Sequence, residues 1–473
     1  MYSNMTSVVR NRGHSSAPIP ILQGTRQGGR TSAQCYLAYI NELINIISNS
    51  GLGICLYNCN TSCPTVADDM ILMAYSGNAL QRMIDICYKY SCKWRFEYNA
   101  SKCAVIVFNR QRSNQPKQSW SLGSDIITET STYTHLGLLC DDHMSSSVLV
   151  DEGIKKLRGT FGSIISSGFT PGEINPLTLR KIYCSVVLPK AFYGAQLWSN
   201  CSKADVKGLE IAHRKCLKQM ATLSSYCDTT FTLTTLDMES AEELMDFYKL
   251  QFLGQLCRLS PNFLAKQVFV QRLIRHISYG DVMFGFIPDI CRLVEKYELG
   301  HFIDTYISTG RFPGKPAWGR ILNTYVKRPY KRQREIILNE QWDTDISSAF
   351  KLSNSDNIWT ALKKTPKYSK YCYNAVRIIG FAVSRQFVSA CKRCGKLSNS
   401  HVTHAFWFCE KSSPTRRKLI CDLNDAMGRE KFCALVRSPL LSQCRQVALF
   451  ATQVENGLFV NAHLLTTLHK LMY

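Results

Sequence analysis

The chain has 473 residues, of which 45% are hydrophobic and 11% aromatic, a composition that supports buried cores and excludes global disorder. Lysine and arginine number 57 against 35 aspartates and glutamates, which gives a formal net charge of +22. A surplus of this size attracts polyanions, and no membrane-spanning, amphipathic or lipid-anchoring segment competes with nucleic acid as the expected partner.

The cysteines indicate a reducing compartment. There are 21 of them, an odd number spread along the whole chain, whereas disulfide scaffolds are usually short and even-numbered. The first basic residues are not followed by the apolar core of a secretory signal. We therefore expect reduced thiols and an intracellular location, in the nucleus or the cytoplasm, and no secretion.

The N-terminal part begins with a polar segment. Residues 1–19 have no periodicity and predict a flexible lead-in. Residues 24–29 have three glycines in six positions, which disfavours helix and strand, so a loop is expected. A helix should follow from Ser32 to Ile47, because apolar residues recur along one stripe. That stripe consists of Cys35, Tyr39, Leu43 and Ile47.

An acidic pair stands between two short apolar runs. Residues 53–57 and 70–74 predict strands, with Asp68-Asp69 in the turn before the second strand. Two adjacent carboxylates in a tight turn supply the hard oxygen ligands that divalent cations prefer. In polymerases, two such ions hold the attacking and leaving oxygens of an in-line displacement.

A second helix and another strand continue this region. Ser76 or Asn78 fits the N-cap of the helix, and Ala104 to Phe108 predicts the strand. The alternation of helices and strands indicates an α+β fold. The apolar face of the helix consists of Leu80, Met83, Ile84, Cys87, Tyr90 and Trp94.

From about residue 148 the pattern becomes helical. Asn175-Pro176 is typical of a helix start, with asparagine as the N-cap and proline in the first turn. Pro189 is expected to kink or break the helix that contains it. The expected helical segments are 177–198, 204–220 and, with short breaks, 226–320.

Six segments form an ordered series of motifs. They are residues 24–32 (GTRQGGRTS), 39–43 (YINEL), 66–69 (VADD), 99–102 (NASK), 133–137 (YTHLG) and 188–198 (LPKAFYGAQLW). In this order they resemble the reverse transcriptases of non-LTR (LINE-type) retrotransposons, over roughly residues 20–225. The resemblance implies an RNA-directed DNA polymerase fold with a palm and a helical thumb, and RNA and DNA as partners.

The resemblance also implies catalytic roles. Asp68 would coordinate Mg2+ with Asp69 beside it, and Lys102 would approach the departing pyrophosphate as a cation and proton donor. Gln27 and Gly28 would line the place where the template pairs with the incoming nucleotide.

Two further residues, Leu136 and Gly137, would seat the primer end according to the same resemblance. The sequence departs from the family pattern at Val66, where an aromatic residue is usual. It also departs at four positions behind the glycine-rich loop, where the family usually has apolar residues or proline. These departures indicate a divergent copy. These positions are Arg30, Thr31, Ala33 and Gln34.

One catalytic carboxylate of the family has no counterpart in this chain. The family uses a further aspartate upstream of the glycine-rich loop, but no aspartate precedes Asp68, and Glu42 is the one acid in that part. We therefore expect an N-terminally truncated, reverse-transcriptase-like chain that does not polymerise alone. The alternatives are a non-catalytic nucleic-acid-binding protein and the remnant of a degraded element.

A cysteine and histidine cluster lies near the C-terminus. The pattern is Cys391-x2-Cys394-x9-His404-x4-Cys409, which suits a tetrahedral structural Zn2+, and His401 competes with His404 as the third ligand. LINE-type elements carry a zinc knuckle of this kind. The three cysteines before the acidic pair are instead expected to act as small apolar residues. They are Cys55, Cys59 and Cys63.

A basic and aromatic segment around residues 325–334 is the remaining candidate for nucleic-acid binding. Cations neutralise phosphates and aromatic rings stack on bases, so the segment fits a polyanion as well as it fits a solvated helix face or linker. The candidate contacts are Lys327, Arg328, Lys331 and Arg332.

The expected architecture is α+β: a partial reverse-transcriptase palm, then a mostly α-helical thumb and connector, with a small zinc-knuckle-like module near the C-terminus. The boundaries are 1–19 lead-in, 20–140 palm, 141–225 thumb, 226–385 helical and basic connector, 386–430 zinc module and 431–473 C-terminal helices.

Overall fold

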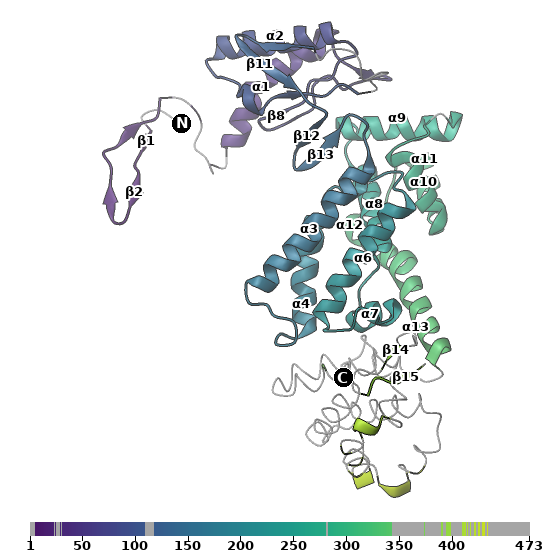
Figure 1. Ribbon diagram of the computed structural model, residues 1–473. Helices are drawn as coiled ribbons and strands as arrows, with labels where there is room; N and C mark the ends of the chain where they lie inside the picture. Colours follow the sequence, from purple (N-terminus) through teal and green to yellow (C-terminus); the bar gives the residue numbers. More distant parts are fainter. Residues whose placement is uncertain are drawn as a thin grey trace. The chain divides into compact units, whose positions relative to one another are not determined.

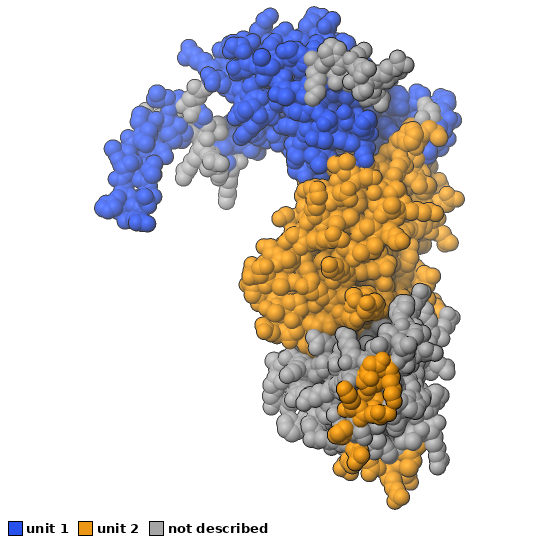
Figure 2. All heavy atoms as spheres, viewed as in Figure 1, with its two compact units in different colours: residues 1–145, 259–281 blue, residues 146–258, 282–473 orange. Residues whose placement is uncertain are grey.

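The computed structural model describes residues 5–22, 24, 29, 31–108, 118–280 and 282–342, and short runs or single residues between 373 and 433. The chain forms two compact units, which Figure 2 colours separately. Unit 1 contains residues 1–145 and 259–281, and unit 2 contains residues 146–258 and 282–473.

Residues 6–20 form an antiparallel ribbon where the sequence predicted a segment without regular structure. β1 (Thr6–Ser7) pairs with β4 (Ile19–Pro20), and β2 (Arg10–Asn11) pairs with β3 (His14–Ser15) (Figure 1). All residues from Thr6 to Leu22 are exposed. The pairing satisfies backbone hydrogen bonds. Because neither face of the ribbon is buried, its sequence has no alternation of apolar and polar residues from which the strands could be predicted.

Two amphipathic helices, α1 (Ser32–Asn49) and α2 (Gly77–Trp94), pack together in unit 1. Both helices were predicted, and Ser76 caps α2 by accepting from the Ala79 N–H at 3.3 Å. Leu43 and Ile47 of the predicted stripe of α1 are buried, whereas Cys35 is exposed and Ile40 is buried in addition. The shared core consists of Ile40, Leu43, Ile47, Cys63, Met83, Cys87 and Tyr90.

A neighbouring side of α2 covers a three-stranded sheet with the order β10-β11-β9. β9 (Ala104–Val105) runs parallel to β11 (Asp125–Glu129), and β10 (Trp120–Leu122) is antiparallel to β11. Strand β9 is shorter than the predicted strand. The core between α2 and this sheet consists of Ile84, Val105, Trp120, Leu122 and Ile127.

Three short hairpins complete the strands of this region, and each has a two-residue turn. They are β5 (Cys55–Leu56) with β6 (Cys59–Asn60), β7 (Thr65–Val66) with β8 (Asp69–Met70), and β12 (Thr132–His135) with β13 (Leu138–Asp141). The predicted strand 70–74 is paired at Met70 and again through a bridge between Ala74 and Gly53.

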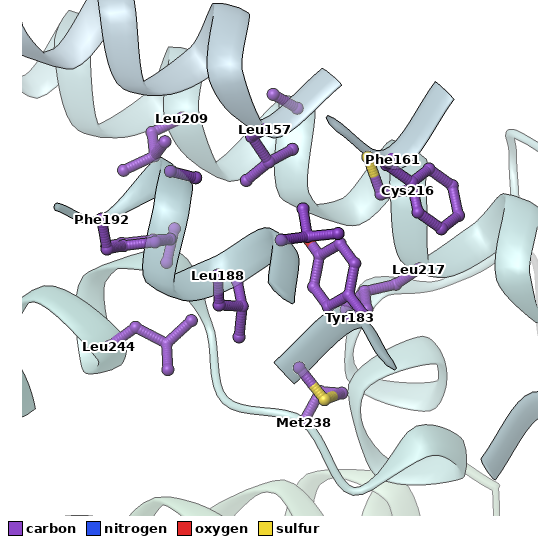
Figure 3. Packing of buried hydrophobic residues seen from close by; sticks show 14 of the residues in the cluster. Leu157, Phe161, Tyr183, Leu188, Phe192, Leu209, Cys216, Leu217, Met238 and Leu244 are labelled. Atoms are coloured by element: carbon purple, nitrogen blue, oxygen red, sulfur yellow. The ribbon is translucent and has the colours of Figure 1, made fainter. Parts of the chain in front are cut away.

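Unit 2 is built from helices around one large core, which Figure 3 shows in part. Tyr183 and Leu188 lie in its centre and are almost fully buried. One buried cluster has members from Val150 to Met245, on both sides of the predicted boundary at 225/226. The helices are α3 (Ser146–Ser166), α4 (Pro176–Ile182), α5 (Leu188–Ala191), α6 (Lys203–Met220), α7 (Thr229–Leu236) and α8 (Ala241–Arg258).

The helix that contains Pro189 neither ends nor breaks at the proline. Asn175 caps its start as predicted, and a π-helical turn, η2 (Tyr183–Val187), then leads into α5. The Leu188 N–H bonds to the Tyr183 carbonyl, five residues back. A wider turn of this kind accommodates the missing proline N–H without stopping the helix.

Residues 264–342 add further helices, which were predicted up to residue 320. One of them, α9 (Leu264–Tyr279), belongs to unit 1, where the Arg275 guanidinium lies 4.7 Å from the ring centroid of Tyr57. None of the helices described for this chain is long and apolar enough to cross a membrane. The others are α10 (Phe286–Lys296), α11 (Gly300–Thr309), α12 (Lys315–Leu322), the π turn η4 (Asn323–Lys327) and α13 (Arg328–Trp342).

Candidate functional site

The acidic pair lies at the tip of the β7–β8 hairpin. Val66 pairs with Asp69, so Ala67 and Asp68 form the turn, and Ala67 adopts a left-handed φ of 54°. Both carboxylates are exposed. The predicted turn is therefore confirmed for Asp68, while Asp69 is the first residue of the returning strand.

Backbone hydrogen bonds hold this hairpin on a small sheet. The Ile71 N–H donates to the Pro64 carbonyl at 3.0 Å, and the Met73 N–H donates to the Ser62 carbonyl at 2.9 Å. The Ile54 N–H donates to the Met73 carbonyl at 3.0 Å and ties in the β5–β6 hairpin. The acidic turn is thus attached to a paired scaffold.

Tyr36 of α1 lies close to the acidic turn. Burial raises the pKa of Tyr36, and the negative charge of Asp68 raises it further. Tyr36 and Met70, which follows the acidic pair, also pack against the core that contains Ile40 and Leu43, so the helix with the 39–43 motif lies beside the strand that begins at Asp69. Sequence reasoning missed Tyr36, although its position four residues before Ile40 places it on the buried face of the helix.

Two other motifs are joined by one hydrogen bond. Lys102 ends the short 3-10 helix Ala100–Lys102, which Asn99 caps by accepting from the Ser101 N–H. The Tyr133 hydroxyl of β12 donates to the Lys102 carbonyl at 2.6 Å. The Lys102 side chain is exposed, and this hydrogen bond anchors the backbone that carries it.

Leu136 and Gly137 form the two-residue turn of the β12–β13 hairpin. Their φ values are 49° and 77°, both left-handed, and His135 pairs with Leu138 across the turn. Leucine seldom adopts this conformation, whereas glycine does so without strain. The turn presents a half-exposed leucine side chain at the tip of the hairpin.

The carboxylates around Asp68 do not make up a two-metal site within the described residues. Glu42 accepts from Lys93 at 3.2 Å and from the Tyr90 hydroxyl at 3.4 Å, so it is held by α2. No group of three or more metal-binding side chains occurs among the described positions. Gln27 and Gly28 lie outside the described residues.

Half of the cysteine and histidine cluster is described. β14 (Ser389–Ala390) pairs with β15 (Leu397–Ser398), and Lys396 forms an ion pair with Glu410 at 2.8 Å. The pKa of Lys396 is raised, chiefly by this hydrogen bond and further by Cys394 and the fully buried Cys409. The ion pair joins the hairpin that contains Cys394 to the residue that follows Cys409. The remaining predicted ligands, Cys391, His401 and His404, lie outside the described residues.

The basic segment is divided between two environments. Lys327 pairs with Glu239 at 2.5 Å, and Lys331 pairs with Asp237 at 2.9 Å. Arg334 pairs with a carboxylate on α8. Lys327 and Lys331, which were predicted to contact nucleic acid, thus hold α13 against acidic residues of their own unit.

Arg328 and Arg332 are exposed, so their predicted role stays a prediction. The aromatic residues of the segment also contact residues of other helices, and their stacking on bases stays a prediction. Tyr325 lies edge-on to Phe302, and the Tyr330 hydroxyl accepts from the Tyr297 hydroxyl at 3.3 Å.

Sequence reasoning missed the acidic residues that hold α13. Three of them occur within seven positions, Asp237, Glu239 and Glu243, at the junction of α7 and α8. Such a cluster indicates a place that favours cations, but the sequence does not identify which basic residues pair with it.

Comparison with known proteins identifies the relatives of the chain, although no protein-family model matches it. The chain is 23% identical over 265 residues to the RNA-directed DNA polymerase from mobile element jockey of Drosophila melanogaster, covering 54% of this chain and 28% of that protein. The protein of the same description from Drosophila funebris is 25% identical over 175 residues, which cover 35% of this chain and 18% of that protein. The chain thus spans less than a third of the length of these relatives. As its motifs indicated, the chain is similar to the RNA-directed DNA polymerases of LINE-type mobile elements.

Proposed function

We propose that the chain is a reverse-transcriptase-like protein of the non-LTR type, which binds RNA and DNA and does not polymerise by itself. The observation that carries the proposal is the Asp68 turn, whose returning strand lies beside the helix of the 39–43 motif. The hydrogen bond from Tyr133 to Lys102, which connects two further motifs, supports the same function.

The residues at the turn fit only part of a magnesium site. Asp68 and Asp69 would supply two hard, exposed oxygen ligands, and Mg2+ would supply Lewis-acid stabilisation of phosphate charge there. A further carboxylate is needed to share the ions, and the described residues place none beside this pair. Catalysis by this chain therefore requires a carboxylate from elsewhere.

Primer extension tests this proposal. Purified chain should not extend a DNA primer on an RNA template in Mg2+, and Asp68→Asn should behave in the same way. Extension that Asp68→Asn abolishes would refute the non-catalytic part and leave the family assignment in place.

Nucleic-acid affinity tests the binding part. Affinity for RNA and DNA should fall steeply as salt rises, since contacts with phosphates release counterions. Weak binding that does not depend on salt would contradict the proposal. If the chain binds and Asp68→Asn leaves the affinity unchanged, a binding protein without polymerase chemistry is the better description.

We also propose that Cys391, Cys394, His404 and Cys409 hold a structural Zn2+, with His401 as the alternative to His404. The ion pair from Lys396 to Glu410, which links the hairpin that contains Cys394 to the segment of the buried Cys409, supports the proposal. Zinc content, measured by mass spectrometry on the native protein, should be one ion for the chain and should be lost in Cys409→Ser. Cys421→Ser, at an exposed cysteine outside the pattern, is the matched control. Zinc retained in Cys409→Ser would disprove the ligand set.

A further inference from the structure

The continuous helix formed by α12, η4 and α13 has two sets of cations on different sides. Residues 315–334 contain no aspartate or glutamate, so the helix does not neutralise its own charge in this part. Trp318, Leu322 and Val326 are buried and fix the inner side. The cations next to this side are the three that form ion pairs, Lys327, Lys331 and Arg334.

The π turn brings three arginines to the outer side. In an unbroken α-helix, with about 100° per residue, Arg328 and Arg332 would be turned by about 80° and 120° from Arg320. The π turn contains one additional residue, which reduces both rotations by about 100°. Arg328 and Arg332 then lie within about 20° of the direction of Arg320, one on each side of it. The exposure of all three side chains agrees with this alignment.

These three arginines, which we call the outer row, lack the partners that the inner cations have. Within the described part of the chain, no ion pair is formed by Arg320, Arg328 or Arg332. The row extends over about 18 Å, calculated from 1.5 Å per residue. One strand of a B-form duplex places about five phosphates along that length. Each planar guanidinium group can donate two parallel hydrogen bonds to two oxygens of one phosphate.

We infer that Arg320, Arg328 and Arg332 form a phosphate-binding row for the backbone of a nucleic-acid strand, whereas Lys327, Lys331 and Arg334 hold the helix in place and do not bind it. The inference rests on the nucleic-acid binding proposed above and assigns it to one surface. Phosphate contacts read no base identity, so the row serves RNA and DNA of any sequence alike.

The test compares two triple variants of the full chain. One is Arg320→Gln, Arg328→Gln, Arg332→Gln. The control removes the same number of charges from exposed positions of α3 and α6. It is Lys155→Gln, Lys207→Gln, Lys215→Gln. Affinity for a duplex oligonucleotide is measured against salt, and circular dichroism confirms that both variants are folded.

We expect the outer-row variant to lower the slope of log affinity against log salt by about 2–3, since each phosphate contact contributes about 0.9. Replacement of the same arginines by lysine should restore most of the slope, because the charge returns. The loss should be the same for oligonucleotides of different sequence.

Two results would overturn the inference while the chain itself still binds. One is an unchanged slope in the folded outer-row variant, and the other is an equal or larger loss in the control. If the unaltered chain does not bind nucleic acid, the proposed function fails and the inference fails with it.

Discussion

Arg334 anchors α13 to unit 2, and its replacement gives a direct measure of that anchor. Its guanidinium donates to both carboxylate oxygens of Glu243, at 2.7 and 2.8 Å. The two side chains are only 14% and 8% exposed. Removing one partner of a buried pair costs about 3–5 kcal/mol because the other charge is left unpaired. Since the arginine is slightly exposed, Arg334→Met should cost about 3 kcal/mol.

The double variant Glu243→Gln, Arg334→Met should be more stable than the single variant. Glu243 also accepts from the Ser240 N–H at 3.1 Å, and a glutamine can keep this cap while removing the unpaired charge. We expect the double variant to cost about 1 kcal/mol, close to the value of one lost hydrogen-bonded interaction.

Hydrogen exchange of α13 peptides and urea unfolding of the chain measure these differences. Arg332→Met is the matched control, since this arginine is exposed two positions away and should change stability by less than about 0.5 kcal/mol. If the double variant is no more stable than Arg334→Met, the cost does not come from a stranded carboxylate and the reasoning is refuted.

Three further predictions concern other parts of the chain. Burial lowers the pKa of His213, so the unfolded chain takes up a proton before the folded chain does, and unit 2 should lose stability as pH falls below about 6.5. His213→Gln should remove this part of the pH dependence in thermal unfolding. Gly123 has a φ of 64° and an added Cβ would lie 2.2 Å from the Tyr88 ring, so Gly123→Ala should lower the melting temperature. Gly159→Ala, in open space on α3, should raise it, and the opposite order would contradict both assignments. Tyr133→Phe should speed hydrogen exchange around Lys102 while leaving α3 unchanged, and uniform acceleration would mean a general loss of stability instead.

Helical periodicity and capping residues predicted most of the helices, because both are local properties. Ser76 and Asn175 cap the helices that they were expected to cap. The buried face of α1 was only partly predicted. Leu37 and Ile46 are apolar but exposed, so apolar residues extend beyond the predicted stripe, and the contact with α2 decides which side is covered.

The candidate site was predictable where a motif is contained in one turn. Asp68 lies in the expected turn, and its neighbours in the chain fix that geometry. Tertiary contacts were not predictable in the same way. The pairing of Lys331 with Asp237 joins residues 94 positions apart, and the inclusion of α9 in unit 1 depends on contacts such as that of Arg275 with Tyr57. A single sequence contains no local signal for such partners.

The π turn at Asn323–Lys327 also determines where the chain tolerates a change in length. This turn contains one residue more than an α-helical turn that covers the same rotation. Deletion of a single residue there therefore restores α-helix and leaves Arg328 and Arg332 on the same side of the helix as Arg320. The same deletion between Trp318 and Leu322 rotates all following residues by about 100° relative to Trp318 and misaligns both sets of cations. Relatives that differ by one residue in this helix should therefore place the gap within 323–327.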